Sequence, residues 1–291
     1  MKHIELFNNG FDLTINEKIK PENYPYIWLD MVSGEIVYTF IPKPADPNTY
    51  VTFTAEEDNS SVGLTRLSTN QTLEYSTDTT TWNTFDTTTN ISLNNGDKVY
   101  VRGELSADNT SSNYTQFKMS GKIAASGNCN ALWNYQDLNA PLKAYCGAYM
   151  FKECTSLTTV PELPATTLVN SCYNNMFRSC TSLTTAPELP ATTLAHTCYG
   201  HMFCRCTSLT TAPELPVTEL ALYCYWNMFD GCTKLNYIKC LATDISANKC
   251  TSGWLSGVSS TGTFVKHPDM NDWTTGTSGI PSGWTVEDAT L

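Results

Sequence analysis

The sequence from Cys154 to Leu220 copies itself: CTSLTTVPELPATTL begins at Cys154, CTSLTTAPELPATTL at Cys180 and CTSLTTAPELPVTEL at Cys206. Two series of cysteines share a period of 26 residues. The first series is Cys146, Cys172, Cys198, Cys224 and Cys250, and the second is Cys154, Cys180, Cys206 and Cys232. Self-similarity at such a period is typical of a solenoid, in which each unit buries its apolar face only against its neighbours.

Each unit divides into an extended rung and a compact second part. In the rung, Leu183 and Leu189 are apolar, but Pro187 and Pro190 exclude a long strand with a full set of ladder hydrogen bonds. In the second part, apolar residues recur at i, i+4, i+5 and i+8, which predicts one buried face of a helix about two turns long. These residues are Cys172, Met176, Phe177 and Cys180.

The repeat decays at both ends, and we expect each end to be a cap. Cys129 begins a degenerate unit one residue shorter than the others, and after Cys232 the Thr-rich rung is replaced by Asn236-Tyr-Ile-Lys-Cys240. The tail from His267 to Trp284 is predicted to close the C-terminal end, because a solenoid must hide an otherwise open core edge.

The tandem pattern C-x-x-L-x-x-A-P-x-L-P followed by C-Y-x-x-M-F-x-x-C resembles the BspA-like (Treponema-type) leucine-rich repeat. The units are about three residues longer than the commoner form, and Met-Phe stands where Ala-Phe is usual. The resemblance covers roughly residues 129–265. It implies a surface protein of gut anaerobes or their phages, and it implies binding of protein or glycan without catalysis.

The rest of the chain reads as two smaller parts. Residues 48–126 show short alternating apolar runs between turn clusters, which predicts a small β-sandwich-like module. In it, Asp78 is expected to satisfy turn amides and Trp82 to pack on the hairpin. Residues 1–47 are expected to form strands at 27–29 and 36–41 with a turn at Ser33–Gly34. They serve either as a strand pair packed on the next domain or as an attachment segment. The predicted fold is thus mainly β with short helices, ending in a capped leucine-rich-repeat solenoid over 127–291 with full units at 146–250.

Composition limits the partners. The net charge of −11 without basic clusters disfavours nucleic acid and anionic membranes. No apolar stretch is long enough to span a bilayer. The first residues, MKHIELFNNGFDLTINEK, lack the apolar core of a signal peptide, so we expect synthesis in the cytosol without general secretion. The periodic cysteines are expected to be free, buried thiols that pack as small hydrophobes; a disulfide ladder is the alternative.

Two clusters of residues are candidates for chemical sites. His196, Cys198, His201, Cys204 and Cys206 offer zinc-ligand types, but the two framework cysteines should point inward and the others outward, so no metal is expected. The second cluster is a column of like charges that should be solvated, although a calcium site along it is an alternative. Its members are Glu162, Glu188 and Glu214. No catalytic residue and no cofactor are expected.

The letters that differ between otherwise similar units are the candidates for binding. They fall in the predicted helix and its entry turn and are expected on an exposed face, either as neutral drift or as a contact surface. The candidates are Tyr149, Asn174, Asn175, Arg178, His196, His201, Arg205, Tyr223 and Trp226.

The resemblance, together with the lack of a signal peptide in the first residues, implies a non-enzymatic phage virion protein, of the head or tail fibre or decoration type. Its N-terminal segment would dock on other virion proteins, and its repeat would bind a host surface glycan or protein. Virion fibres are usually symmetric, which favours a homo-oligomer, although no heptads specify a trimer. The alternatives are a bacterial cell-surface BspA-like adhesin without its leader and, third, a zinc-binding enzyme using the His/Cys cluster.

Overall fold

The computed structural model describes residues 2–6, 11–15, 28–29, 36–37, 49–69, 71–105 and 109–290. The chain forms two compact units, Met1–Asp46 and Pro47–Leu291, which are described separately. The fold is mainly β, with several sheets and very few helical residues, as the sequence predicts. Among the described residues, no helix has both the length and the apolar character needed to cross a membrane.

The N-terminal unit contains two antiparallel strand pairs. Strand β1 (Lys2–Leu6) pairs with β2 (Phe11–Ile15), and β3 (Trp28–Leu29) pairs with β4 (Ile36–Val37). The second pair confirms the strands predicted around residues 28 and 36, whereas the first pair was not predicted. The predicted turn at 33–34 and the rest of the strand predicted at 36–41 lie outside the described residues.

The second unit begins with two sheets that share one core. The larger has the order β13-β12-β5-β10-β7-β8 and the smaller the order β11-β6-β9. Phe53 of β5 contacts Phe117 of β11 with ring centroids 5.2 Å apart, so the sheets face each other across buried rings. The strands are β5 (Val51–Ala55), β6 (Ser60–Arg66), β7 (Thr72–Ser76), β8 (Asn83–Thr84), β9 (Asn90–Leu93), β10 (Lys98–Glu104), β11 (Gln116–Ser120), β12 (Ile123–Ser126) and β13 (Leu157–Thr159).

The larger sheet continues into the repeat. Strand β12 pairs in parallel with β13, which belongs to the first full 26-residue unit. Between them lies α1 (Asn130–Trp133), whose four residues are all buried. Phe117 of the β-module also stacks on Phe151 of the repeat, with centroids 5.1 Å apart. The hydrophobic core is therefore continuous from the β-module into the repeat.

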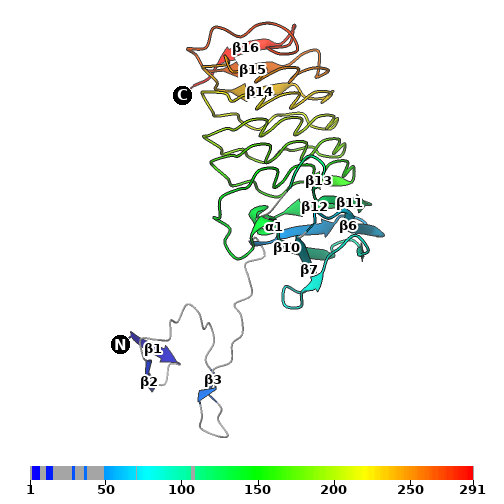
Figure 1. Ribbon diagram of the computed structural model, residues 1–291, viewed down its shortest axis with the longest axis vertical. Helices are drawn as coiled ribbons and strands as arrows, with labels where there is room; N and C mark the ends of the chain where they lie inside the picture. Colours follow the sequence, from blue (N-terminus) through cyan, green and yellow to red (C-terminus); the bar gives the residue numbers. More distant parts are fainter. Residues whose placement is uncertain are drawn as a thin grey trace. The chain divides into compact units, whose positions relative to one another are not determined.

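From residue 145 onward the chain runs in successive circuits stacked on one another, and we call each circuit a coil (Figure 1). The described rungs between β13 and β14 (Tyr237–Cys240) contain only isolated parallel bridges, such as Thr167 to Thr193. This agrees with the prolines that the sequence places there. The tail does more than cover the end, because β15 (Thr263–Lys266) and β16 (Thr285–Asp288) extend a parallel sheet in the order β14-β15-β16.

The short helix predicted at 172–180 is wrong. The backbone instead alternates: Asn175 N donates to Gly200 O of the next coil at 2.9 Å, and Met176 N donates to Tyr173 O three residues back at 3.2 Å. An α-helix would use every N–H within itself and leave neighbouring coils unbonded. Each coil therefore carries a series of overlapping β-turns, which we call the turn run, at residues 171–180 and their equivalents.

Two columns of aromatic rings fill the stack between the coils. The first runs Phe117, Phe151, Phe177, Phe203 and Phe229, with successive centroids 5.1–5.7 Å apart. The second runs Tyr173, Tyr199, Tyr225, Trp254 and Trp273, at 5.4–6.1 Å. Phenylalanine at 151–229 and tyrosine at 173–225 recur every 26 residues, and rings outside these ranges extend both columns into a continuous apolar core.

All twelve cysteines lie in the described part of the chain, and all are unpaired and buried, which confirms the prediction for the two periodic series. The second series has a further role, because its thiols donate to phenylalanine carbonyls of the preceding coil. Cys180 Sγ lies 3.1 Å from Phe151 O, and Cys232 Sγ lies 3.0 Å from Phe203 O. Burial raises the pKa of Cys232 to about 12, so the thiol stays protonated and can donate.

Candidate binding surface

The turn runs hold the residues that the sequence singled out, but not all of them reach solvent. Asn174 and Asn175 are only 7% and 5% exposed, so their predicted exposed position is wrong. Asn174 Nδ2 donates to Gly200 O in the next coil at 3.1 Å, and Asn175 Nδ2 donates to Asn174 Oδ1. These two amides form hydrogen bonds within and between coils. They fit between the coils because this segment is a turn run and not a helix.

Gly200 shows how tightly the coils approach at this point. A Cβ at residue 200 would lie 2.8 Å from Asn174 Nδ2, so the amide occupies the space that a larger residue would need. Cys204 was also expected on the exposed face but is buried, and its Sγ lies 3.7 Å from Asp230 Oδ2. The residues that vary between units therefore fall into two groups: those that pack between coils and those that are exposed to solvent.

The remaining candidates are exposed or half-buried, and several of them meet. His201 contacts the edge of Trp226 with centroids 4.5 Å apart, and Trp226 lies 5.6 Å from Tyr223. His196 also meets Tyr223 edge-on, with ring centroids 5.8 Å apart. Trp226 is 36% exposed and the adjacent Leu222 is 41% exposed. We define the aromatic patch as His196, His201, Leu222, Tyr223 and Trp226.

Cations border the patch. Lys249 Nζ lies 5.6 Å from the centre of the Tyr223 ring, and Arg178 donates from Nη1 to Asn175 Oδ1 at 3.2 Å. Burial, followed by the nearby Arg178 charge, lowers the pKa of His201, so this ring is neutral at pH 7. Arg205 is exposed on the same turn run as His201. The patch thus has neutral rings at its centre and fixed positive charges beside it.

Tyr149 belongs to a neighbouring ring cluster, which the sequence did not indicate. It stacks on Tyr114 of the β-module at 4.5 Å, and the Arg66 guanidinium lies 4.5 Å above the Tyr114 ring. The Arg178 charge acts on the pKa of both Tyr149 and His201. Sequence reasoning also missed Leu222 and Lys249, although both stand at positions that differ between units.

The structure does not bring the residues of either candidate metal cluster together. His196 is exposed, whereas Cys198 and Cys206 are buried in the core. Glu162, Glu188 and Glu214 are all exposed, and Glu214 pairs with Lys239 at 3.0 Å. In the part of the chain that the structure describes, no group of three or more His, Cys, Asp or Glu side chains could hold a metal ion.

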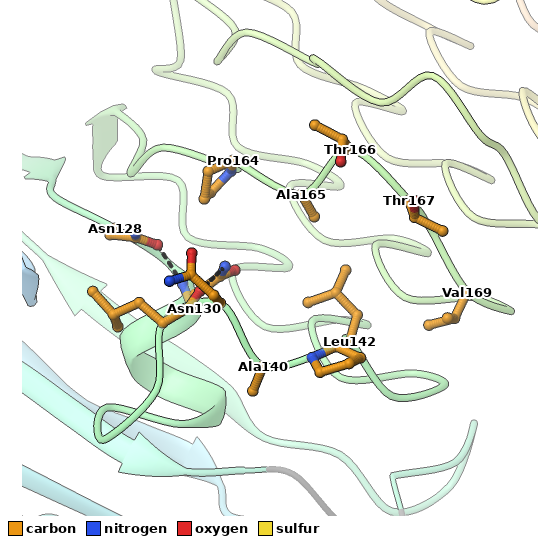
Figure 2. Close-up of a pocket in the computed structure, with 12 residues that line it drawn as sticks. Asn128, Asn130, Ala140, Leu142, Pro164, Ala165, Thr166, Thr167 and Val169 are labelled. Carbon is orange, nitrogen blue, oxygen red and sulfur yellow. Dashed lines mark hydrogen bonds between the residues drawn. The ribbon is translucent and has the colours of Figure 1, made fainter.

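A hollow of about 460 Å³ lies between α1 and the first full coil, with Asn128 and Asn130 on one side and Thr166, Thr167 and Val169 on the other (Figure 2). Its lining contains no charged side chain. Asn130 is already engaged, because its Nδ2 donates to Leu138 O at 2.7 Å and its Oδ1 accepts from Trp133 Nε1 at 2.9 Å. Because the lining has neither a charged nor an aromatic side chain, the aromatic patch is the better candidate.

A scan against models of protein families, a search of curated proteins and a search of solved structures each gave no match.

Proposed function

We propose that this protein is a non-enzymatic binding protein that attaches to a surface glycan or surface protein through the aromatic patch. The observation that supports this proposal is the contact between His201, Trp226 and Tyr223 on an exposed edge of the stack. Exposed Trp and Tyr side chains on a rigid scaffold are typical of binding surfaces, because they bury much area at a low cost in side-chain entropy.

A binding role also agrees with the state of the cysteines. Burial raises the pKa of Cys146 and Cys240 to about 12. A nucleophilic or metal-binding thiol requires the opposite shift, toward the thiolate. The thiols therefore support a packing role rather than an enzymatic one.

We further propose that the coils form a leucine-rich-repeat solenoid of the BspA-like type, following a β-sandwich-like module. Two observations support the solenoid. Backbone groups about 25 residues apart in the sequence are hydrogen-bonded to each other, and neighbouring rungs form parallel bridges. In a solenoid each unit contacts only its neighbours. The exposed edge of the stack is then a long surface on which ligand-binding residues can change without altering the core.

The cellular role that we propose is that of a phage virion appendage, with the N-terminal segment docked on other virion proteins. Its support is the resemblance of the tandem motif to repeats found in phage genomes. A bacterial cell-surface adhesin is the second candidate, and the same resemblance supports it.

The binding role is tested by replacing the two central rings together, Tyr223→Ala and Trp226→Ala, and measuring retention on host cells and on a glycan array. We expect retention to be lost. The matched control is Tyr237→Ala, because Tyr237 is 37% exposed, close to the value for Trp226, but lies on the rung side in β14. If the double variant is retained on host cells as well as the Tyr237→Ala control is, the patch is not the binding surface.

The virion role is tested by electron microscopy with an antibody raised against residues 146–250. We expect the antibody to label phage particles. If the antibody labels bacterial cells but not phage particles, the adhesin is favoured. The neighbouring genes distinguish the two roles independently: capsid and tail genes indicate a virion protein, and polysaccharide-use genes indicate an adhesin.

A further inference from the structure

Rings and cations extend beyond the aromatic patch along the turn-run edge of the stack. In the order of the coils they are Tyr149, Arg178, His201, Trp226, Tyr223 and Lys249, which we call the turn-edge strip. Ring contacts join His201, Trp226 and Tyr223, and Lys249 lies over Tyr223. Arg178 donates to Asn175 Oδ1 at 3.2 Å, and Asn175 occupies the position in its coil that Tyr149 and His201 occupy in the coils on either side. The strip therefore crosses successive coils rather than lying within one.

The length of the strip indicates a polymeric ligand. Neighbouring backbones in such a stack are separated by about 4.8 Å, so four steps between the coil of Tyr149 and that of Lys249 span roughly 19 Å. A single sugar or amino-acid side chain would contact only one part of this surface. An extended chain parallel to the stack can reach all of it, and its affinity then rises with each added unit.

The charge of the strip differs from that of the whole protein. The chain has 28 acidic and 17 basic residues, yet Arg178 and Lys249 have no carboxylate partner among the described residues. Two acidic residues lie close by and are already engaged. Glu153 lies in the coil before Arg178, where its N–H donates to Arg178 O at 2.8 Å, and its carboxylate pairs with Lys152 at 3.3 Å. Asp230 accepts from the Cys204 thiol. Unpaired cations beside exposed rings suit a ligand that carries both carboxylates and apolar ring faces.

We propose that the turn-edge strip binds an acidic polysaccharide, a chain of sugars with carboxylates on successive units, aligned with the stack. The sugar faces pack on Trp226 and Tyr223, while Arg178 and Lys249 pair with the carboxylates. This inference rests on the proposed binding function and specifies its ligand class.

The test uses the full chain and a length series of uronic-acid oligosaccharides, from the disaccharide to the octasaccharide, with binding measured by calorimetry at low and high salt. We expect the affinity to rise with length until the oligosaccharide covers the strip. We also expect it to fall with added salt, because the paired charges are exposed and screened. The comparison ligand is the same polymer with its carboxylates reduced to alcohols, which should bind more weakly.

Two variants identify the residues. Arg178→Gln and Lys249→Gln should each weaken binding of the acidic series roughly two- to fivefold, the range for one exposed ion pair, and weaken binding of the reduced polymer less. The matched control is Lys234→Gln, since Lys234 is exposed away from the strip.

The outcomes separate the two proposals. Equal binding of the acidic and reduced polymers, or binding only of a host surface protein, overturns the inference and leaves the binding function standing. If the Tyr223→Ala and Trp226→Ala double variant also retains all binding to host cells, the proposed function falls as well.

Discussion

At the scale of single residues, the turn runs depend on left-handed backbone at every fourth position. In one coil these residues are Ser171, Asn175 and Ser179, with φ between 55° and 62°. A side chain in this region costs about 1–2 kcal/mol, which glycine avoids. The later coils use glycine at equivalent positions, as at Gly231, Gly253 and Gly257. Equivalent positions in different coils thus hold either glycine or a residue with a side chain. The left-handed backbone conformation repeats at these positions, whereas the side chain does not.

Ser179→Gly is therefore expected to keep or raise the free energy of unfolding, by up to about 1 kcal/mol, because released strain exceeds the entropy cost of glycine. The control is Ser182→Gly, three residues on and outside the left-handed region, which should lose roughly 0.5–1 kcal/mol. Urea unfolding of both variants measures the difference. Equal destabilisation by the two substitutions would contradict the role of strain.

Asp78 and Trp82 illustrate a residue-scale interpretation that the structure confirms. Asp78 Oδ1 accepts from Thr81 N at 2.7 Å and from Thr80 N at 2.8 Å. Trp82 packs edge-on against Tyr50 at 4.8 Å and lies under the Arg102 guanidinium at 3.9 Å. The amide hydrogen bonds, that of Thr81 first, hold the pKa of Asp78 well below its usual range.

This shift predicts a pH-dependent effect of Asp78→Asn. The folded state disfavours protonation of Asp78, so its contribution is present above the unfolded pKa of about 3.9 and is lost as pH falls below it. The variant should have a lower Tm than wild type near pH 7, and the difference should shrink near pH 3. Thermal unfolding at both pH values measures this. A difference that is constant with pH would show that the carboxylate charge contributes nothing.

At the scale of elements, the turn run and the aromatic columns stabilise each other. Phe177 is fully buried and stacks on Phe151 and Phe203, with centroids 5.4 and 5.7 Å away. Its carbonyl oxygen accepts from Cys206 Sγ at 3.1 Å. One residue thus contributes both packing between coils and a hydrogen bond between them, and the short turn run needs no helical propensity of its own.

Phe177→Ala is expected to lower the free energy of unfolding by about 3–5 kcal/mol, the usual cost of a large cavity in a close-packed core. Phe177→Leu keeps most of the volume and should lose less. Denaturant unfolding followed by circular dichroism measures both. A loss of under about 1 kcal/mol for the alanine variant would mean that neighbouring coils collapse freely into the space.

At the scale of the whole molecule, the proposed solenoid predicts that one complete unit can be removed. Deletion of residues 181–206 joins Cys180 to Thr207, which restores the Cys-Thr junction and lets Phe177 stack on Phe229. The variant should fold cooperatively with a smaller m value, because less surface is exposed on unfolding.

Deletion of residues 181–193, half a unit, is the control. It should abolish cooperative unfolding, since rungs would then face turn runs in every later coil. Gel filtration and near-ultraviolet circular dichroism distinguish the two shortened chains. Similar behaviour of both would argue against a repeat stacked in register.

The 26-residue period, the burial of the cysteine and leucine series and the absence of long strands in the proline-bearing rungs could all be predicted from the sequence. These follow from local chemistry: a cysteine or leucine at a fixed slot is buried in every coil, and proline cannot donate to a ladder. The sequence also indicated that the letters which do not repeat include the surface residues, and Trp226 and Tyr223 agree with that.

Whether residues 172–180 form a helix or a turn run depends on the tertiary structure. Buried residues at 172, 176 and 180 recur every four positions, and both a helix and a series of turns with a four-residue repeat produce that spacing. The choice depends on hydrogen bonds to the next coil about 25 residues away, which no local pattern contains. The same non-local contacts bury Asn174 and Asn175, bring Tyr114 to Tyr149 and join Trp226 to His201, because each coil's surface is defined by the coil stacked on it.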